Sequence, residues 1–219
     1  EPYATDANDV KNKIYELEFK SEKADKELKI KQEKQEEKKI IKGTFTDSRD
    51  SKTYKSVKIG TQTWMAENLA YKPGSGKYWA YDKNESNITI YGYLYNWETA
   101  KNVCPSGWHL PNHVEWLTLT DYLGGESVAG GKLKESGTTH WHTPNTGATN
   151  ETGFTALPGG YRGHGGTFYG IGSDGCWWSS TENYVNRAFS RSMNCNYSAV
   201  SSYWNLKKFG FSVRCVRDN

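Results

Sequence analysis

Apolar and charged positions follow a helical period over the first part of the chain. Apolar residues recur at alternating spacings of four and three: Val10, Ile14, Leu17, Ala24 and Leu28. This spacing places side chains along one face of an α-helix. Ser21 interrupts the stripe, which ends where Lys31, Gln35 and Lys38 occupy its positions. The pattern therefore predicts a helix with a thin, short heptad seam.

The composition of this segment agrees with a helix. Residues 1–43 hold 11 Lys and 11 Asp or Glu, and no glycine precedes Gly43. Acid-to-base pairs four residues apart, such as Glu16–Lys20, each support a helix by roughly 0.2–0.5 kcal/mol. We therefore expect residues 1–42 to form a charged helical spacer or a weakly oligomerising stalk. Because its charges cancel, no nucleic-acid partner is expected.

From residue 43 onward the pattern changes to short apolar runs between glycine-rich turns. The runs predict these strands: Thr44–Thr46, Thr53–Ile59, Thr63–Glu67, Cys176–Ser180, Arg187–Met193 and Phe209–Val216. Helical spacing predicts helices at Tyr93–Val103 and Asn112–Leu123. Residues 124–175 show little periodicity, and so long a connection should be functional or internally packed. We therefore predict an α+β domain over residues 43–219.

Four cysteines permit three pairings: Cys104, Cys176, Cys195 and Cys215. Cys176 and Cys195 flank two predicted strands, so a cross-strand disulfide is one reading, which leaves Cys104 to pair with Cys215. Four buried thiols are the other reading. Disulfides would indicate an oxidising compartment, and hence an exported protein whose signal segment has been removed. Residues 1–219 contain no apolar run long enough to span a membrane.

Several ordered blocks carry a family resemblance. They are Asp47-Ser-Arg-Asp50, Tyr54–Gly60, Gln62–Leu69, Cys104-Pro-Ser-Gly-Trp-His-Leu-Pro111, Trp177-Trp-Ser-Ser-Thr-Glu182 and Gly210–Arg217. Over residues 43–217 the chain resembles the Fibrobacter succinogenes major paralogous domain. That family is similar to C-type-lectin-like and formylglycine-generating-enzyme-like domains. The resemblance implies a C-type-lectin-like fold with paired terminal strands, two helices and a long irregular loop region.

The resemblance also carries expectations about chemistry and location. It implies the nested disulfides Cys104–Cys215 and Cys176–Cys195. It also implies an exported or cell-surface protein, often a lipoprotein, so that the expected membrane contact is a removed lipid anchor. Formylglycine-generating activity requires a close pair of reactive cysteines, which this sequence lacks. We therefore expect no enzyme activity, although a degenerate enzyme of that type stays an alternative.

A calcium site would need oxygen ligands, several of them from carboxylates. A lectin-type calcium site uses a Glu-Pro-Asn or Gln-Pro-Asp loop, but Thr143-Pro-Asn145 lacks the leading ligand. Calcium favours six to eight oxygen ligands. Asp174, Glu182 and Asn183 are the weak candidates for a structural calcium, and turn chemistry is the other reading of them. No other cofactor is expected.

The segment between Asn183 and Asn205 is rich in Tyr, Ser, Asn and Arg, residue types that form adaptable binding surfaces. It also resembles the Asn-, Tyr- and Ser-rich region of variable proteins made by diversity-generating retroelements. We expect ligand contacts at Arg191, Tyr197, Tyr203, Trp204 and Asn205. A solvated polar loop is the alternative. Tryptophans in the family-like blocks are expected in the core: Trp64, Trp108, Trp116, Trp177 and Trp178.

These observations favour an exported, non-enzymatic binding or adhesion module on a charged helical spacer. Its expected ligand is a protein or a glycan at the cell surface. A structural subunit of a surface assembly, which contacts its partners through the N-terminal helix, is the alternative.

Overall fold

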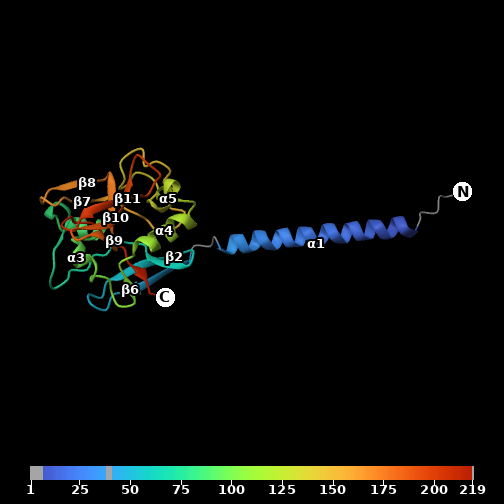
Figure 1. The fold of residues 1–219 in the computed structure, drawn as a ribbon, viewed down its shortest axis with the longest axis horizontal. Helices are drawn as coiled ribbons and strands as arrows, with labels where there is room; N and C mark the ends of the chain where they lie inside the picture. Colours follow the sequence, from blue (N-terminus) through green and yellow to red (C-terminus); the bar gives the residue numbers. More distant parts are fainter. Residues whose placement is uncertain (1–6, 38–40, 219) are drawn as a thin grey trace. The chain divides into compact units, whose positions relative to one another are not determined.

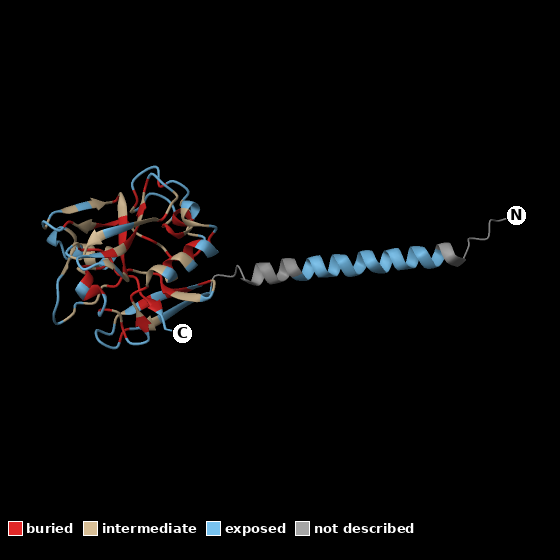
Figure 2. Cartoon of the chain, viewed as in Figure 1, coloured by how far each residue is buried: buried red, intermediate tan, exposed pale blue. Residues whose placement is uncertain are grey.

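The computed structural model describes residues 7–37 and 41–218 (Figure 1). The chain divides into two compact units, Glu1–Lys39 and Ile40–Asn219. The first unit contains one helix, α1 (Ala7–Glu37). Residues 10–29 of α1 are all exposed (Figure 2). The predicted helical segment 1–42 also includes residues 1–6 and 38–40, which lie outside the described residues. None of the described helices is both long and apolar enough to cross a bilayer.

The second unit is a mixed α+β domain, as predicted. Its strands are β1 (Ile41–Thr46), β2 (Thr53–Ile59), β3 (Gln62–Met65), β4 (Tyr78–Trp79), β5 (Leu94–Tyr95), β6 (Trp108–His109), β7 (Gly159–Arg162), β8 (Phe168–Ile171), β9 (Asp174–Tyr184), β10 (Arg187–Asn194), β11 (Ser201–Leu206) and β12 (Val216–Arg217). Its helices are α2 (Ser86–Tyr91), α3 (Trp97–Ala100), α4 (His113–Tyr122) and α5 (Glu126–Leu133), with a 3₁₀ turn at Tyr81–Lys83.

One five-stranded sheet joins the two ends of the domain. Its strand order is β1-β2-β3-β12-β6, so the last strand of the chain lies between two early ones. Val216 on β12 is paired with Trp64 on β3 and with His109 on β6. The first and last strands thus share one sheet, but they are not paired as the family resemblance implies, because β1 pairs with β2 and β12 pairs with β3 and β6.

A second five-stranded sheet has the order β11-β10-β9-β7-β8. Strands β9, β10 and β11 form an antiparallel meander, and β11 lies at the edge of the sheet. A two-stranded sheet, β4-β5, completes the strands of the described residues.

Two clusters of buried side chains form the core, and the buried positions are red in Figure 2. Successive residues of a strand point to opposite faces, so Trp177 of β9 enters one cluster and Trp178 the other. The five tryptophans predicted in the core are all buried: Trp64, Trp108, Trp116, Trp177 and Trp178. That prediction is confirmed.

Three segments differ from the secondary structure expected from the sequence. Phe209–Val216 is predicted as one strand, but it forms only isolated bridges at Gly210, Phe211 and Ser212 before β12 begins at Val216. Tyr93–Val103 is predicted as one helix but forms β5 followed by the four residues of α3. Helix α5 lies inside the segment 124–175 and was not predicted, because Gly130 and Gly131 disfavour a helix. Both glycines are required by packing. A Cβ at Gly130 would lie 2.3 Å from the Ala199 carbonyl oxygen, and one at Gly131 would lie 2.4 Å from that of Gly147.

The cysteines confirm one implied disulfide and overturn the other. Cys104 and Cys215 form a disulfide, whereas Cys176 and Cys195 are buried free thiols. The reason is strand register. Cys176 on β9 lies opposite Ser192 on β10. Cys195 lies three residues beyond Ser192, an odd number, so it belongs to the opposite face of the sheet and to the other core cluster.

Candidate functional site

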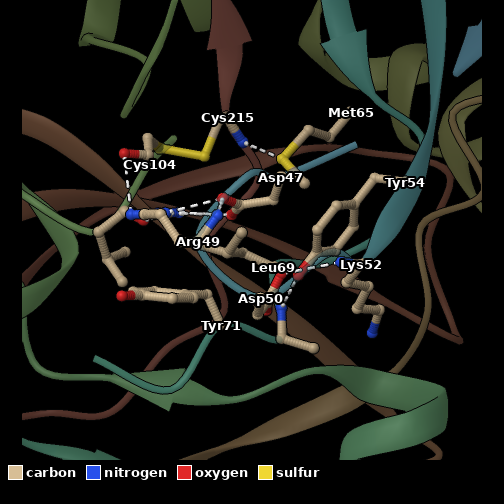
Figure 3. A network of polar contacts seen from close by, with 12 residues as sticks. Asp47, Arg49, Asp50, Lys52, Tyr54, Met65, Leu69, Tyr71, Cys104 and Cys215 are labelled. Atoms are coloured by element: carbon tan, nitrogen blue, oxygen red, sulfur yellow. Dashed lines mark hydrogen bonds and ion pairs between the residues drawn. A yellow bond between two sulfur atoms is a disulfide. The ribbon is translucent and has the colours of Figure 1, made fainter. Parts of the chain in front are cut away.

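The block Asp47–Asp50, between β1 and β2, connects these strands with the region of the Cys104–Cys215 disulfide (Figure 3). Asp47 is buried, and its carboxylate accepts hydrogen bonds from Nε and Nη2 of Arg49, the shortest at 2.6 Å. Nη2 of Arg49 also donates to the Val103 carbonyl at 3.0 Å, next to Cys104. The guanidinium lies 3.7 Å from the ring centre of Tyr71. These contacts connect Asp47 and Arg49 with the segment that carries Cys104.

The pKa of Asp47 reflects this pair. Burial alone would raise the pKa, but the hydrogen bonds and the positive charge of Arg49 outweigh burial and lower it. Asp47 is therefore ionised at neutral pH, as its contacts with Arg49 require.

Three other signature blocks meet at Asn68 in the core. The Asn68 side-chain oxygen accepts hydrogen bonds from Nε1 of Trp177 and from Nη2 of Arg214, each at 2.9 Å. Arg214 is buried and also donates to the carbonyls of Phe154 and Thr155. Burial lowers the pKa of Arg214 to about 9. The signature residues thus interlock in the interior.

An aromatic group at the β11 edge of the second sheet is different, because much of it is exposed. Trp204 on β11 lies opposite Phe189 on β10, with their ring centres 5.8 Å apart and nearly perpendicular. Tyr184, at the end of β9, meets Trp204 edge-on at 6.4 Å. His113 of α4 packs on Phe189 at 4.3 Å. We call these four residues the Trp204 cluster. Trp204 is 50% exposed and Tyr184 60%.

Arg191 lies beneath the Trp204 cluster, so its position does not support the expected ligand contact. Its side chain is fully buried. It is two residues from Phe189 on β10, so it points to the same face of the sheet. Its Nη1 forms an ion pair with Glu126 of α5, and its Nη2 lies 3.2 Å from Nδ1 of His113. Arg191 therefore positions His113 and cannot reach a ligand at the surface.

The electrostatics keep His113 neutral. Burial and the nearby charge of Arg191 lower the pKa of His113. The backbone N–H of His113 donates to the Thr181 hydroxyl on β9 at 2.9 Å, which fixes the start of α4. The Trp204 cluster is thus supported from two sides, by α4 and by Arg191.

The other predicted contacts lie elsewhere. Tyr203 is 54% exposed, but it follows the strand alternation and points to the opposite face from Trp204. Asn205 lies on the Tyr203 face and donates to the Ser190 hydroxyl at 2.8 Å. Tyr197 is 65% exposed and belongs to the connection between β10 and β11. The predicted residues therefore do not form one continuous surface.

The segment that carries Tyr197 is held by Lys134. This lysine is buried, and its ammonium donates to the backbone carbonyls of Thr146, Asn194 and Tyr197 at 2.8–3.1 Å. Burial lowers the pKa of Lys134 to about 8. The segment 124–175 is thus internally packed, which is one of the two readings its length allowed.

The three calcium candidates do not converge. Asp174 and Glu182 lie eight residues apart on β9, roughly 26 Å at the usual strand rise. Asp174 accepts a hydrogen bond from Asn194 at 2.7 Å, and Glu182 pairs with Lys207 at 3.0 Å. Asn183 follows Glu182 on the same strand. Over residues 7–37 and 41–218, no three His, Cys, Asp or Glu side chains come together in a way that could hold a metal ion.

Sequence reasoning missed three members of the Trp204 cluster. Tyr184, Phe189 and His113 join Trp204 through strand pairing and the start of α4. The signal in the sequence was the short connection between the β9 and β10 runs, since a hairpin there brings Tyr184 near the partner strand. The register that pairs Phe189 with Trp204 could not be read, because the segment before β11 has no clear turn signature.

Comparison with known proteins places the domain in a family. A family model described as the Fibrobacter succinogenes major domain matches residues 57–217. No curated protein and no solved structure matches the chain. The matched region holds the interlocking residues Asn68, Trp177 and Arg214, together with the Trp204 cluster. The chain belongs to the Fibrobacter succinogenes major domain family.

Proposed function

We propose that the chain is an exported, non-enzymatic binding module that presents the Trp204 cluster to a protein or glycan at the cell surface. The observation that carries the proposal is the half-exposed ring of Trp204, held edge-on by Tyr184 and Phe189 on an edge strand. A ring fixed in this way offers a large contact area at low entropic cost. The buried Arg191 beneath it, paired with the partly exposed Glu126, pre-organises the surface.

A C-type-lectin-like scaffold is the fold that we propose for the domain. Three features support it: the first and last strands in one sheet, the long segment 124–175 with few regular elements, and the disulfide between Cys104 and Cys215. The disulfide also supports export, because such bonds persist in oxidising compartments. Attachment through a removed lipid anchor is part of the same proposal.

The thiols support a role without catalysis. Cys176 and Cys195 lie in different core clusters, so they do not form the close pair that copper-dependent oxidase chemistry needs. Burial raises the pKa of Cys176 to about 12, which keeps this thiol protonated and unreactive.

The experiment is a screen followed by matched substitutions. The full chain is screened on glycan and protein arrays, and each hit is retested with W204A and Y184A. Y169A is the control, because Tyr169 is a similarly exposed tyrosine on β8, at the opposite edge of the same sheet. We expect W204A and Y184A to weaken binding at least tenfold, by about 1.4 kcal/mol or more each. Full binding by W204A at an unchanged melting temperature would refute the proposed site.

Tyr203 and Tyr197 are tested in the same screen. Because Tyr203 points to the other face, Y203A should leave binding at the Trp204 cluster intact. If Y203A and Y197A abolish binding while W204A does not, the ligand face is the opposite one.

A further inference from the structure

Helix α1 presents an apolar stripe with no partner among the described residues. Val10, Ile14, Leu17 and Leu28 are between 46% and 66% exposed. In a heptad, Val10 and Leu17 occupy d positions, and Ile14 and Leu28 occupy a positions. Such a stripe gains stability when a second helix covers it. The question is which helix the stripe fits.

The charged residues beside the stripe indicate which helix would cover it. Lys13 and Lys20 occupy the g positions that precede two a residues, and Glu18 and Asp25 occupy e positions. In a parallel, in-register pair, each g residue contacts the e residue five positions later in the other helix. Lys13 then meets Glu18 of the second copy, and Lys20 meets Asp25. Both contacts, and their symmetry equivalents, join opposite charges.

An antiparallel pair of the same helices is less favourable. Antiparallel coiled coils bring e residues against e residues and g residues against g residues. When Ile14 is aligned with Ala24 of the second copy, Glu18 faces Glu18 and Lys20 faces Lys20. The antiparallel alignment therefore combines attraction with like-charge repulsion, whereas the parallel one contains attraction alone.

We infer that α1 pairs with α1 of a second copy of this chain as a parallel, in-register, two-stranded coiled coil. A β-branched residue at a (Ile14) followed by Leu at d (Leu17) favours two strands. Ser21 at a and Ala24 at d keep the pairing weak. Parallel helices end together, so the two domains follow from the same end of the coil. The inference holds whether or not the Trp204 cluster binds a ligand.

Charge reversal in the full chain tests the partner and the register. The variant K13E/K20E places acidic residues opposite Glu18 and Asp25, and the control K23E/K26E makes the same charge change at outward-facing positions. Each double variant also removes two acid–base contacts four residues apart within one helix, so helix content is matched. Sedimentation should show a native dimer. Association should weaken on the order of a hundredfold in K13E/K20E and change little in the control.

The complementary variant E18K/D25K completes the charge test. Each reversed variant should sediment as a monomer alone, and a mixture of the two should recover the dimer. A native chain that stays monomeric to millimolar concentration overturns the inference. So does a species larger than a dimer, or equal loss of association in the control.

Cross-linking tests orientation independently of charge. In a parallel, in-register pair, residue 21 of each chain lies across the seam from its own copy. The S21C variant should therefore form an interchain disulfide under mild oxidation, and K26C, on the outer face, should not. Cys176 and Cys195 are buried and do not interfere. Failure of S21C to cross-link at concentrations where the chain is dimeric overturns the parallel arrangement.

Discussion

The interior around Asn68 and the β11 edge each contain an arginine and a tryptophan, and the two regions differ in what they leave exposed. Around Asn68, Trp177 and Arg214 satisfy their polar groups with one another and with backbone carbonyls, and all three are buried. At the β11 edge, Arg191 is buried but Trp204 above it is half exposed. The residues around Asn68 thus form part of the scaffold, whereas the Trp204 cluster leaves part of its rings at the surface.

The largest expected effect on stability comes from removing the disulfide between Cys104 and Cys215. Cys104 and Cys215 are 111 residues apart in sequence. Replacing both by Ser removes a long closed loop and should lower the free energy of unfolding by about 4–5 kcal/mol on a chain-entropy model. Urea unfolding measures the loss. The control is C176A/C195A, which removes two thiols and no disulfide. If the control loses as much stability, the closed loop does not explain the effect.

A smaller loss is expected from the ion pair next to the disulfide. R49M leaves the buried carboxylate of Asp47 without its partner. It should cost about 2–3 kcal/mol, below the value for a fully buried pair because the Arg49 side chain is 27% exposed. The double variant D47N/R49M should recover part of the loss. An R49M chain as stable as the native one would show that the pair is not needed.

The same ion pair has a pH signature. Because the pKa of Asp47 is lowered in the fold, its contribution to stability is present above the unfolded value of about 3.9 and is lost as the pH falls through the folded pKa. Acid unfolding of the native chain should therefore be steeper than that of D47N. Identical acid profiles would contradict this assignment.

At the β11 edge, His113 should make the stability of the domain depend on pH. The pKa of His113 is lowered in the fold, so the unfolded chain binds a proton that the folded chain does not. Stability should be greatest above the unfolded value of about 6.5 and should fall as the pH drops toward the folded pKa. The melting temperature from pH 7.5 to 5 measures the slope, and H113Q should flatten it. A slope unchanged in H113Q would assign the effect to another group.

The smallest effect on stability is expected at Trp204, and it separates the exposed region from the buried one most clearly. W204A should change the free energy of unfolding by less than about 1 kcal/mol, since much of the ring is already in water. W178A, two strands away in the same sheet, should cost about 3–5 kcal/mol because it is fully buried. Equal losses in the two variants would mean that Trp204 belongs to the core after all.

Much of the scaffold could be predicted from the sequence. Asn112 and Glu115 form a capping box at the start of α4, so local chemistry sets where that helix begins. The strand runs near Thr53 and Arg187 were also located from their residue types. Helix α5 could not be predicted, because Gly130 and Gly131 have low helix propensity. They are present because close packing against neighbouring backbone leaves no room for a Cβ.

The site was harder to predict because it depends on register. Along β10, polar and apolar residues occupy both faces, so alternation alone could not show that Arg191 points inward. The same ambiguity led to the wrong disulfide between Cys176 and Cys195. Both errors disappear once Ser192 is known to lie opposite Cys176. Composition pointed to the segment that contains Trp204, but strand pairing decides which of its residues reach the surface.

The ammonium of Lys134 has a consequence for how this domain tolerates its surroundings. Two segments converge on it, one through the carbonyl of Thr146 and the other through those of Asn194 and Tyr197, so that three oxygens surround one positive charge. That charge is covalently attached to the chain, so it cannot be diluted away or extracted by a chelator. The exposed segment bearing Tyr197 should therefore keep its shape in water of any calcium content.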